Sequence, residues 1–401
     1  MRIVWLAVAD ARGHLMRAHL ARRLLEQRGA RVDVLTTSEE GRAFLAALGT
    51  PSELLSCHFG VAYDDRQNMA RGQTEACALR YFFTPSRGAA DLARLAAIAR
   101  GASYVVNDFH PLLLVAGARG SREGAALPCP VVHVYGENLW GAIEGHFDGH
   151  RGALLSRGFG AIVRGLRDRA HARIEHTFAA PLAGEHDRAG RSYRLLPMVA
   201  APRRDAEEVR ASLGVRRSAR LAAVYLNPHF ADPAVAASIE AALSAAGFAM
   251  IHAVGEGYAD RPGWRPYDPA FADVAAAADL LVSAPGMGAV GMARLFGVPF
   301  LGLLTDQPEQ RANVRFLAAS PDTAFATEDL GPLHLTERLR GAAQGLIQRA
   351  APALDRPPAA SVVGAVHDRW AHVLTELAAP AIPRRRAHLI SKPNAIQEVR
   401  P

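Results

Sequence analysis

The stretch RIVWLAVADARGHLMRAHLARRLLEQRGARVDVLTT, residues 2–37, decides the fold class of this chain. It begins with an apolar run at 2–8, which is typical of a strand buried on both faces of a sheet. Residues 16–29 carry leucines at helical spacing and end on a glycine, which predicts a helix. Residues 31–37 alternate apolar and polar side chains, which predicts a second strand. A strand, a helix and a strand in this order predict a parallel pair joined by a right-handed crossover.

The same alternation of strands and helices recurs along the chain. Ser38 is placed to cap a helix over 39–48, and later strands are predicted at 104–107 and 131–135. A second series begins near residue 221, with predicted strands at 221–226, 248–254, 279–284 and 299–304 and helices at 233–247 and from about 289. We therefore expect an α/β fold with two doubly wound, Rossmann-like domains that face each other across a cleft.

Changes in composition predict the boundaries between these domains. The first domain is expected over 1–200 and the second over 221–379. Between them, residues 201–220 form a charged stretch that can hold a linker. The tail, 380–401, is polar and interrupted by prolines, so we expect it to be partly disordered.

Length and charge limit the kinds of partner and function that the protein can have. The chain has 401 residues, half of them apolar, which is enough for two hydrophobic cores. Its net charge is +7, and Lys392 is the only lysine among its 46 basic residues. We interpret the excess of arginine as a GC-rich coding bias, with attraction to an anionic partner such as a nucleotide phosphate as the alternative. No zinc-finger spacing or aromatic-basic RNA motif occurs, so nucleic acid is not an expected partner.

Cysteine content and apolar runs indicate the compartment. Cys57, Cys77 and Cys129 have no metal-binding spacing and cannot all pair, which favours a reduced, cytoplasmic protein without a bound metal. No apolar run is long enough to span a bilayer, and the first ten residues lack the features of a signal peptide.

Polar residues follow two strands of the first predicted sheet. His14 lies in the turn after the first strand, and Asp108 ends the strand at 104–107. A histidine alone in such a place is more often a capping or surface residue. Because the carboxyl ends of parallel strands share one edge, however, the two side chains can meet there. A carboxylate that orients an imidazole suits a general base for a hydroxyl group. The nearby His110 is expected to be structural or to face an acceptor.

The second predicted domain contains a glycine-rich turn, SAPGMGAVG, at 283–291. Glycine lets the backbone approach a phosphate closely, and the following helix offers free N–H groups. Such turns are also common as plain structure. Farther along, Glu309, Gln310 and Asn313 begin another helix, where they can bind sugar hydroxyls. The alternative for Glu309 is that it only complements the helix dipole.

These two motifs together resemble the GT-B glycosyltransferases. ARGHLMRAHLARRL is similar to the amino-terminal turn of UDP-glycosyltransferases and of the lipid II-forming N-acetylglucosaminyltransferase. SAPGMGAVGMARLFGVPFLGL, followed by EQRAN, is similar to their donor motif, and the resemblance extends in order to about residue 375. It implies that the first domain binds the acceptor and the second a nucleoside-diphosphate sugar, with UDP as the expected nucleotide. The implied reaction is an inverting transfer to a hydroxyl group of a natural product or lipid-linked acceptor, with no cofactor and no metal.

The resemblance also implies a role for individual residues. His14 is the expected general base and Asp108 its support. The other implied site residues are, for the diphosphate turn, Ser283, Gly286, Met287 and Gly288; for the sugar, Glu309, Gln310 and Asn313; for the nucleobase, Trp264 and Tyr267; and for the acceptor, Arg17, His110 and Trp140.

The chain departs from the donor motif at three positions. Relatives carry a ribose-binding glutamate where this chain has Met292, whose thioether is only a weak hydrogen-bond acceptor. Ala289 and Ala284 replace a common threonine and a common basic residue. An unusual donor, a different ribose contact, a non-catalytic accessory protein on this scaffold and a nucleotide-sugar epimerase therefore stay open as alternatives.

Two further stretches have a functional and a plain interpretation. Residues 151–174 have an apolar and a basic face, which fits either contact with an anionic membrane or an ordinary helix packed on the core. His146, Asp148 and His150 have spacing that a metal could use, but a flexible loop over the acceptor site is the preferred interpretation.

Overall fold

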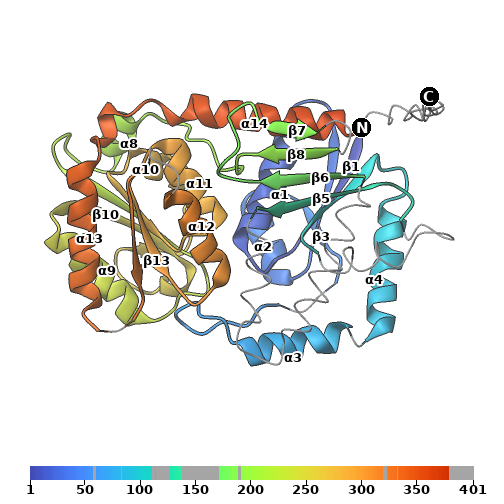
Figure 1. Cartoon of the computed structure of the whole chain (residues 1–401), viewed down its shortest axis with the longest axis horizontal. Helices are drawn as coiled ribbons and strands as arrows, with labels where there is room; N and C mark the ends of the chain where they lie inside the picture. The colour runs from blue at the N-terminus through green and yellow to red at the C-terminus, as the bar shows by residue number, and fades with distance from the viewer. Residues whose placement is uncertain are drawn as a thin grey trace, which may run out of the picture.

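The computed structural model of the chain describes residues 1–56, 60–82, 84–110, 113, 127–137, 171–187, 191–318, 323–331 and 333–378. In it, two domains built on parallel sheets lie side by side (Figure 1). The expected α/β fold with two Rossmann-like domains is therefore confirmed.

The first domain is built on an eight-stranded sheet with the order β3-β2-β1-β4-β5-β6-β8-β7. All neighbours are parallel except β7 and β8. The strands are β1 (Arg2–Ala7), β2 (Arg31–Thr36), β3 (Ser52–Leu54), β4 (Tyr104–Asp108), β5 (Val131–Gly136), β6 (Ala172–His176), β7 (Glu185–Asp187) and β8 (Ser192–Leu195). The described helices are α1 (Arg12–Glu26), α2 (Glu39–Ala47), α3 (Arg71–Phe82) and α4 (Pro85–Ile98).

The second domain has a six-stranded parallel sheet with the order β11-β10-β9-β12-β13-β14. Its strands are β9 (Arg220–Leu226), β10 (Phe248–Gly255), β11 (Trp264–Arg265), β12 (Leu280–Ser283), β13 (Phe300–Leu304) and β14 (Phe325–Asp329). Its helices are α8 (Ala206–Ser212), α9 (Pro233–Ala245), α10 (Phe271–Ala277), α11 (Met287–Phe296), α12 (Pro308–Ala318) and α13 (Leu335–Arg349). The charged stretch expected to hold a linker contains α8, which packs against α10.

The start of α1 determines where His14 lies. The helix begins at Arg12, four residues before the expected start, and Ala11 precedes it in an extended conformation without a side-chain cap. His14 is therefore on the first turn of α1, directly beyond the carboxyl end of β1. By contrast, the predicted cap of α2 is confirmed, because the Ser38 hydroxyl accepts a hydrogen bond from the Gly41 N–H at 2.9 Å.

The last described helix, α14 (Ala359–Glu376), joins the two domains. It runs along the upper edge of the molecule and packs on α1 and β8 of the first domain and on α11 of the second (Figure 1). Trp370 is fully buried and donates its indole N–H to the Leu196 carbonyl at 2.8 Å. Tyr104 donates to the Leu374 carbonyl at 2.6 Å. One hydrophobic core cluster consequently contains residues of both domains.

Candidate functional site

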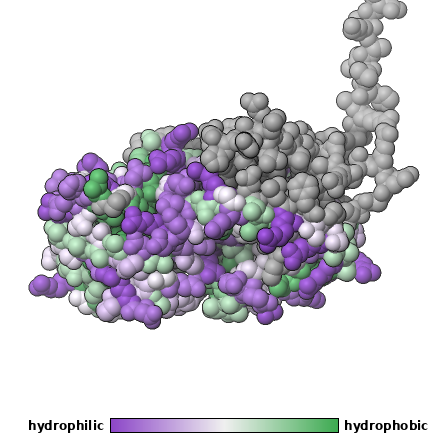
Figure 2. Space-filling view, turned by 90° about the horizontal axis from the view of Figure 1, so that it is seen from below, coloured by the Kyte–Doolittle hydropathy of each residue, from purple (hydrophilic) through white to green (hydrophobic). Residues whose placement is uncertain are grey.

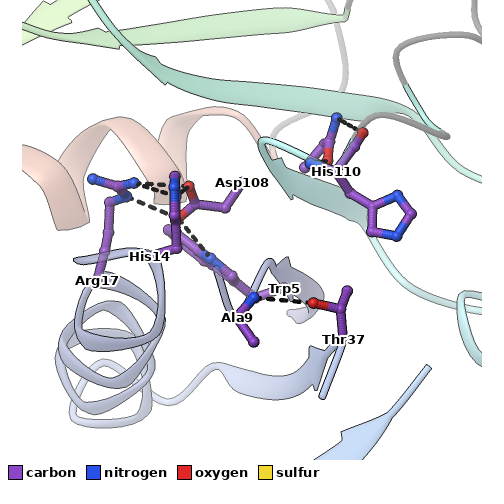
Figure 3. Close-up of polar contacts among 8 residues, drawn as sticks. Trp5, Ala9, His14, Arg17, Thr37, Asp108 and His110 are labelled. Atoms are coloured by element: carbon purple, nitrogen blue, oxygen red, sulfur yellow. Dashed lines mark hydrogen bonds and ion pairs between the residues drawn. The ribbon is translucent and has the colours of Figure 1, made fainter. Parts of the chain in front are cut away.

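His14 and Asp108 meet at the carboxyl ends of β1 and β4. The His14 Nδ1 lies 2.6 Å from an Asp108 carboxylate oxygen, and this contact is visible in Figure 3. His14 follows β1 on α1 and Asp108 ends β4, and these two strands are neighbours, since Ala7 of β1 pairs with Asp108. Asp108 is fully buried, whereas the His14 side chain is 21% exposed. The imidazole can therefore hold the carboxylate on one side and reach solvent on the other.

The Asp108 carboxylate is ionised by its surroundings. Arg17, one turn after His14 on α1, donates to both carboxylate oxygens at 2.8 and 2.7 Å. The Trp5 indole N–H lies 3.4 Å from the same group. Burial raises the pKa of Asp108, but the charges and hydrogen bonds of Arg17 and His14 outweigh burial and hold this pKa well below its usual range. Arg17, which was expected on the acceptor side, has its guanidinium committed to Asp108 and is only 6% exposed.

The backbone turns sharply directly after Asp108 at the end of β4. The following residue, Phe109, has a φ of 72°, an uncommon conformation for a residue with a side chain. Asn107 supports this turn, because its side chain accepts from the His110 N–H at 2.8 Å and donates to the His110 carbonyl at 3.2 Å. The Phe109 ring is parallel to the His14 ring at 6.1 Å. His110 itself is buried, and its ring points away from the His14–Asp108 pair (Figure 3).

The glycine-rich turn of the second domain leads into α11. Gly286 precedes this helix, no side chain caps the helix, and its first turn contains no acidic residue. A Cβ added at Gly286 or Gly288 would meet no atom within 4 Å, so space lies open beside the turn. Asn313 of α12 is fully buried and donates to the Pro285 carbonyl at 2.8 Å. The Asn313 hydrogen bond thus fixes the turn on the α12 side, while the space beside Gly286 and Gly288 is open. The free N–H groups in the first turn of α11 can bind an anion.

Glu309 links this side of the cleft to His14. It stands in the first turn of α12 and is exposed to solvent. Desolvation raises the pKa of Glu309, and the nearby charges of His14 and Arg17 oppose this rise. The Glu309 carboxyl group of the second domain therefore faces the His14 side of the first. Gln310, by contrast, is 3% exposed, and its side-chain oxygen accepts from the Thr305 N–H at 3.0 Å.

The remaining residues expected to bind the donor differ in their exposure to solvent. Ser283 is 3% exposed at the end of β12, while Met287 begins α11 and is half-buried. Tyr267 is 37% exposed and stands edge-on to Phe44 of the first domain, with ring centroids 6.5 Å apart. Trp264 is only 6% exposed, and its N–H donates to Glu240 at 2.5 Å. In contrast to our expectation, the structure encloses the Trp264 ring in the core, where it packs under Gly255.

A segment of the first domain crosses to the second. We call residues 60–70 the strap; in Figure 1 it precedes α3 at the lower edge of the molecule. Its Asp65 carbonyl accepts from the Ala231 and Asp232 N–H groups at 2.8 and 3.0 Å. Its Arg66 pairs with Asp232 at 2.6 Å. Seen from this lower side, hydrophilic residues predominate over the middle of the molecule (Figure 2).

The strap also holds the residues just before α12. The Met69 N–H donates to the Asp306 carboxylate at 2.7 Å, and Gln307 donates to the Gln67 carbonyl at 2.8 Å. A further ion pair between the domains joins Arg12 of α1 to Glu256 of the second domain at 2.8 Å. Sequence reasoning missed the strap, since a polar loop without periodicity carries no signal for its partner.

Two other residues of the site were also missed. His176 ends β6 and is 3% exposed, and its Nδ1 has no hydrogen-bond partner among the described residues. Burial, followed by the charge of Arg17, lowers the pKa of His176 well below its usual value. Phe109 was missed because its left-handed backbone has no sequence signature. His176 was detectable in principle, because it ends a strand at the same sheet edge as Asp108.

Several expectations fall on residues outside those described. They concern Trp140, the possible metal ligands at 146–150, most of the helix at 151–174 and the tail from 380. Within the described ranges, no group of three or more potential metal ligands occurs. A search of the described helices finds none with both the length and the apolar character needed to cross a bilayer.

Comparison with known proteins identifies the fold. No family model and no curated protein matches the chain. Among solved structures, CalG4, the calicheamicin glycosyltransferase, matches with a TM-score of 0.59 and 15% identity over 96% of this chain and 100% of its own. The spinosyn rhamnosyltransferase SpnG complexed with thymidine diphosphate matches with a TM-score of 0.55 and 16% identity over 94% and 100%. An Arabidopsis thaliana UGT complexed with quercetin matches with a TM-score of 0.60 and 11% identity over 94% and 99%. The expected fold, that of the GT-B glycosyltransferases, is thereby confirmed.

Proposed function

We propose that this protein is an inverting glycosyltransferase that moves a sugar from a nucleoside-diphosphate sugar to a hydroxyl group of a small acceptor, with His14 as the general base. The observation that carries the proposal is the 2.6 Å contact between the His14 Nδ1 and Asp108, and the open space beside the glycine turn of the second domain supports it. The solved structures of similar fold include one bound to thymidine diphosphate and one bound to quercetin, which is consistent with a nucleotide on one side and a small acceptor on the other.

We infer the tautomer of His14 from the group that its Nδ1 contacts. Because the Nδ1 faces a carboxylate at 2.6 Å, it carries the proton and donates it, which leaves the lone pair on the Nε2. The Nε2 would take the proton of the acceptor hydroxyl as its oxygen attacks the anomeric carbon. The bond from that carbon to the phosphate oxygen breaks, and the nucleoside diphosphate leaves. Asp108 stabilises the imidazolium that forms.

The leaving group would be held by the turn before α11. The negative charge that develops on the diphosphate would be stabilised by the free N–H groups of Met287 and Gly288 at the positive end of the helix dipole. The open space beside Gly286 and Gly288 gives a phosphate close access to the backbone. Glu309, which faces His14 from α12, is placed to accept hydrogen bonds from the sugar hydroxyls.

A two-stage experiment tests this function. First, the thermal stability of the protein is measured with UDP, TDP and sugars linked to each, and a rise in Tm is expected for at least one nucleotide. The stabilising donor is then assayed with a panel of flavonoid and macrolide acceptors. His14→Ala should lower turnover by about two to four orders of magnitude without changing nucleotide affinity.

His372→Ala is the matched control, because His372 is exposed on α14, away from the pair. Unchanged turnover in His14→Ala would rule out the base assignment. The absence of any nucleotide effect on Tm would favour an accessory protein on this scaffold. Conversion of the donor sugar without an acceptor would indicate an epimerase.

A further inference from the structure

Arg17 occupies an unusual place for an arginine of an amphipathic helix. It lies one turn after His14 on the same side of α1, and it is 6% exposed. Its Nε and one terminal nitrogen donate to the two oxygens of Asp108 at 2.8 and 2.7 Å. The same terminal nitrogen lies 3.0 Å from the His14 Nδ1. One carboxylate, one guanidinium and one imidazole thus form one cluster of polar contacts (Figure 3).

Two opposite charges lie beside the imidazole in this cluster. A buried carboxylate that touched only His14 would favour the imidazolium, because an unpaired buried charge is costly. A general base must instead be uncharged before the reaction. The guanidinium supplies the missing positive charge, and its position 3.0 Å from the ring opposes a second cation there.

The other groups that face His14 do not replace Arg17 in this role. Glu309 of α12 is exposed to solvent, and its interaction with the His14 ring is electrostatic. His176 approaches from β6, and burial and the Arg17 charge keep it neutral. Among the described residues, Asp108 is the fully buried carboxylate that bonds to His14, and Arg17 is the cation that balances it.

We propose that Arg17 is a positioning residue that neutralises Asp108, so that the carboxylate orients His14 without holding it in the charged form. The inference rests on the proposed function only for the role of His14 as a base. The balance of charge is a property of the resting protein, and it can be measured without any substrate.

The test measures the protonation of His14 directly. The imidazole resonances are followed by NMR from pH 5 to pH 9, and His14→Gln assigns the His14 signal. In Arg17→Met, the midpoint of the His14 titration should rise by about one pH unit or more relative to the parent, because the carboxylate then favours the imidazolium. In Arg17→Met combined with Asp108→Asn, the midpoint should return toward that of the parent. Arg22→Met, which removes an arginine paired with Glu26 on the same helix, is the matched control and should leave the midpoint unchanged.

The possible outcomes separate the two proposals. A folded Arg17→Met with an unshifted midpoint would overturn the role of Arg17. If this variant does not fold, Asp108→Asn alone decides, because the unbalanced guanidinium should lower the midpoint and an unchanged or higher one would overturn the inference. Where transferase activity is found, the acid limb of kcat/KM in Arg17→Met should move to higher pH by the same amount as the midpoint. A shifted midpoint in a protein without transferase activity would retain the role of Arg17 and remove only that of the base.

Discussion

The buried histidine His19 shows how one side chain can limit the pH range in which this protein is stable. Its ring bonds to the Thr50 hydroxyl at 2.7 Å, and it is 7% exposed. Burial, and then the positive charges of Arg23, Arg203 and Arg22, lower the pKa of His19 from 6.5 to about 4. The folded state therefore binds the proton less tightly than the unfolded state does. The resulting stability is fully present above pH 6.5 and is lost as the pH falls toward 4.

Replacing His19 should make the protein less sensitive to acid. We expect the free energy of unfolding of the parent to fall between pH 6.5 and pH 4.5, and His19→Gln to remove up to about 3 kcal/mol of that fall. Urea unfolding at several pH values measures the slope. His372→Gln, on the exposed side of α14, should retain the slope of the parent. Both proteins retain the buried His133 and His176, so the two slopes differ only through His19. The prediction fails if the stability of His19→Gln falls with pH as steeply as that of the parent.

Single residues of the site were predictable from the sequence to different degrees. The meeting of His14 and Asp108 could be predicted, because both follow strands of one parallel sheet and must lie at the same edge. The contact of Arg17 with Asp108 could not, since an arginine on an amphipathic helix is most often solvated. Trp264 illustrates the opposite error. An aromatic residue in a stretch rich in glycine and proline suggests a ligand site, but here its ring fills the space beneath Gly255.

At the scale of elements, buried strands were the most predictable. The apolar runs at 2–8 and 131–135 match β1 and β5 within one residue at each end. A strand covered on both faces has a continuous apolar sequence, so its ends are easy to recognise. The start of α1 was less predictable, since Ala11 provides no capping side chain that a sequence could reveal. The same holds for α11, which begins at Met287 after an uncapped glycine, where we expected a start near 289.

The glycines of the α11 turn offer a test in which stability and binding respond differently. Gly286 has a φ of −75°, which any residue can adopt, and an added Cβ would meet nothing within 4 Å. Gly286→Ala should therefore leave Tm nearly unchanged. If a diphosphate approaches the backbone here, the same methyl group occupies its space, and nucleotide affinity should fall by about tenfold or more, a change of at least ~1.4 kcal/mol.

Gly291 is the matched control on the same helix. Its Cβ would lie 3.0 Å from a Val199 methyl group and 3.2 Å from the Pro197 ring, so Gly291→Ala should lower Tm. Differential scanning fluorimetry gives both stabilities, and isothermal titration calorimetry with the stabilising nucleotide gives both affinities. Full nucleotide affinity in a stable Gly286→Ala would show that the phosphates bind elsewhere.

At the scale of the whole molecule, two segments decide how the domains are joined. On the upper edge, α14 returns from the second domain and buries Trp370 against the first, so the connection is apolar and continuous with the core. On the lower edge, the strap makes polar contacts with the second domain. Neither partner was predictable, because each contact joins residues more than 150 positions apart, as with the Arg66–Asp232 and Trp370–Leu196 pairs. The α14 contact between the domains is apolar and the strap contact is polar. Because polar contacts can be replaced by contacts with water, we expect the domains to separate on the strap side.

Breaking one ion pair should loosen the strap while leaving the domains folded. The Arg66 guanidinium donates to Asp232 at 2.6 Å, and the Asp232 side chain is 10% exposed, so this charge-assisted hydrogen bond is partly protected from water. Such a bond contributes about 1.5 to 3 kcal/mol. In Arg66→Ala, we therefore expect hydrogen exchange of the interdomain amides, those of Ala231, Asp232 and Met69, to become about ten to a hundred times faster. Mass spectrometry of peptic fragments measures this exchange.

The control for this prediction is Arg42→Ala, because Arg42 pairs with Glu39 at 2.7 Å on the exposed face of α2 and has no role between the domains. It should leave the exchange of all three amides as in the parent. The amides of β1 and β9 should exchange equally slowly in both variants, since the two sheets do not depend on the strap. Equal exchange of the interdomain amides in Arg66→Ala and the parent would mean that the backbone contacts of Asp65 and the Asp306 carboxylate hold the strap by themselves, and the opening of the cleft would then have to be sought on the side of α14.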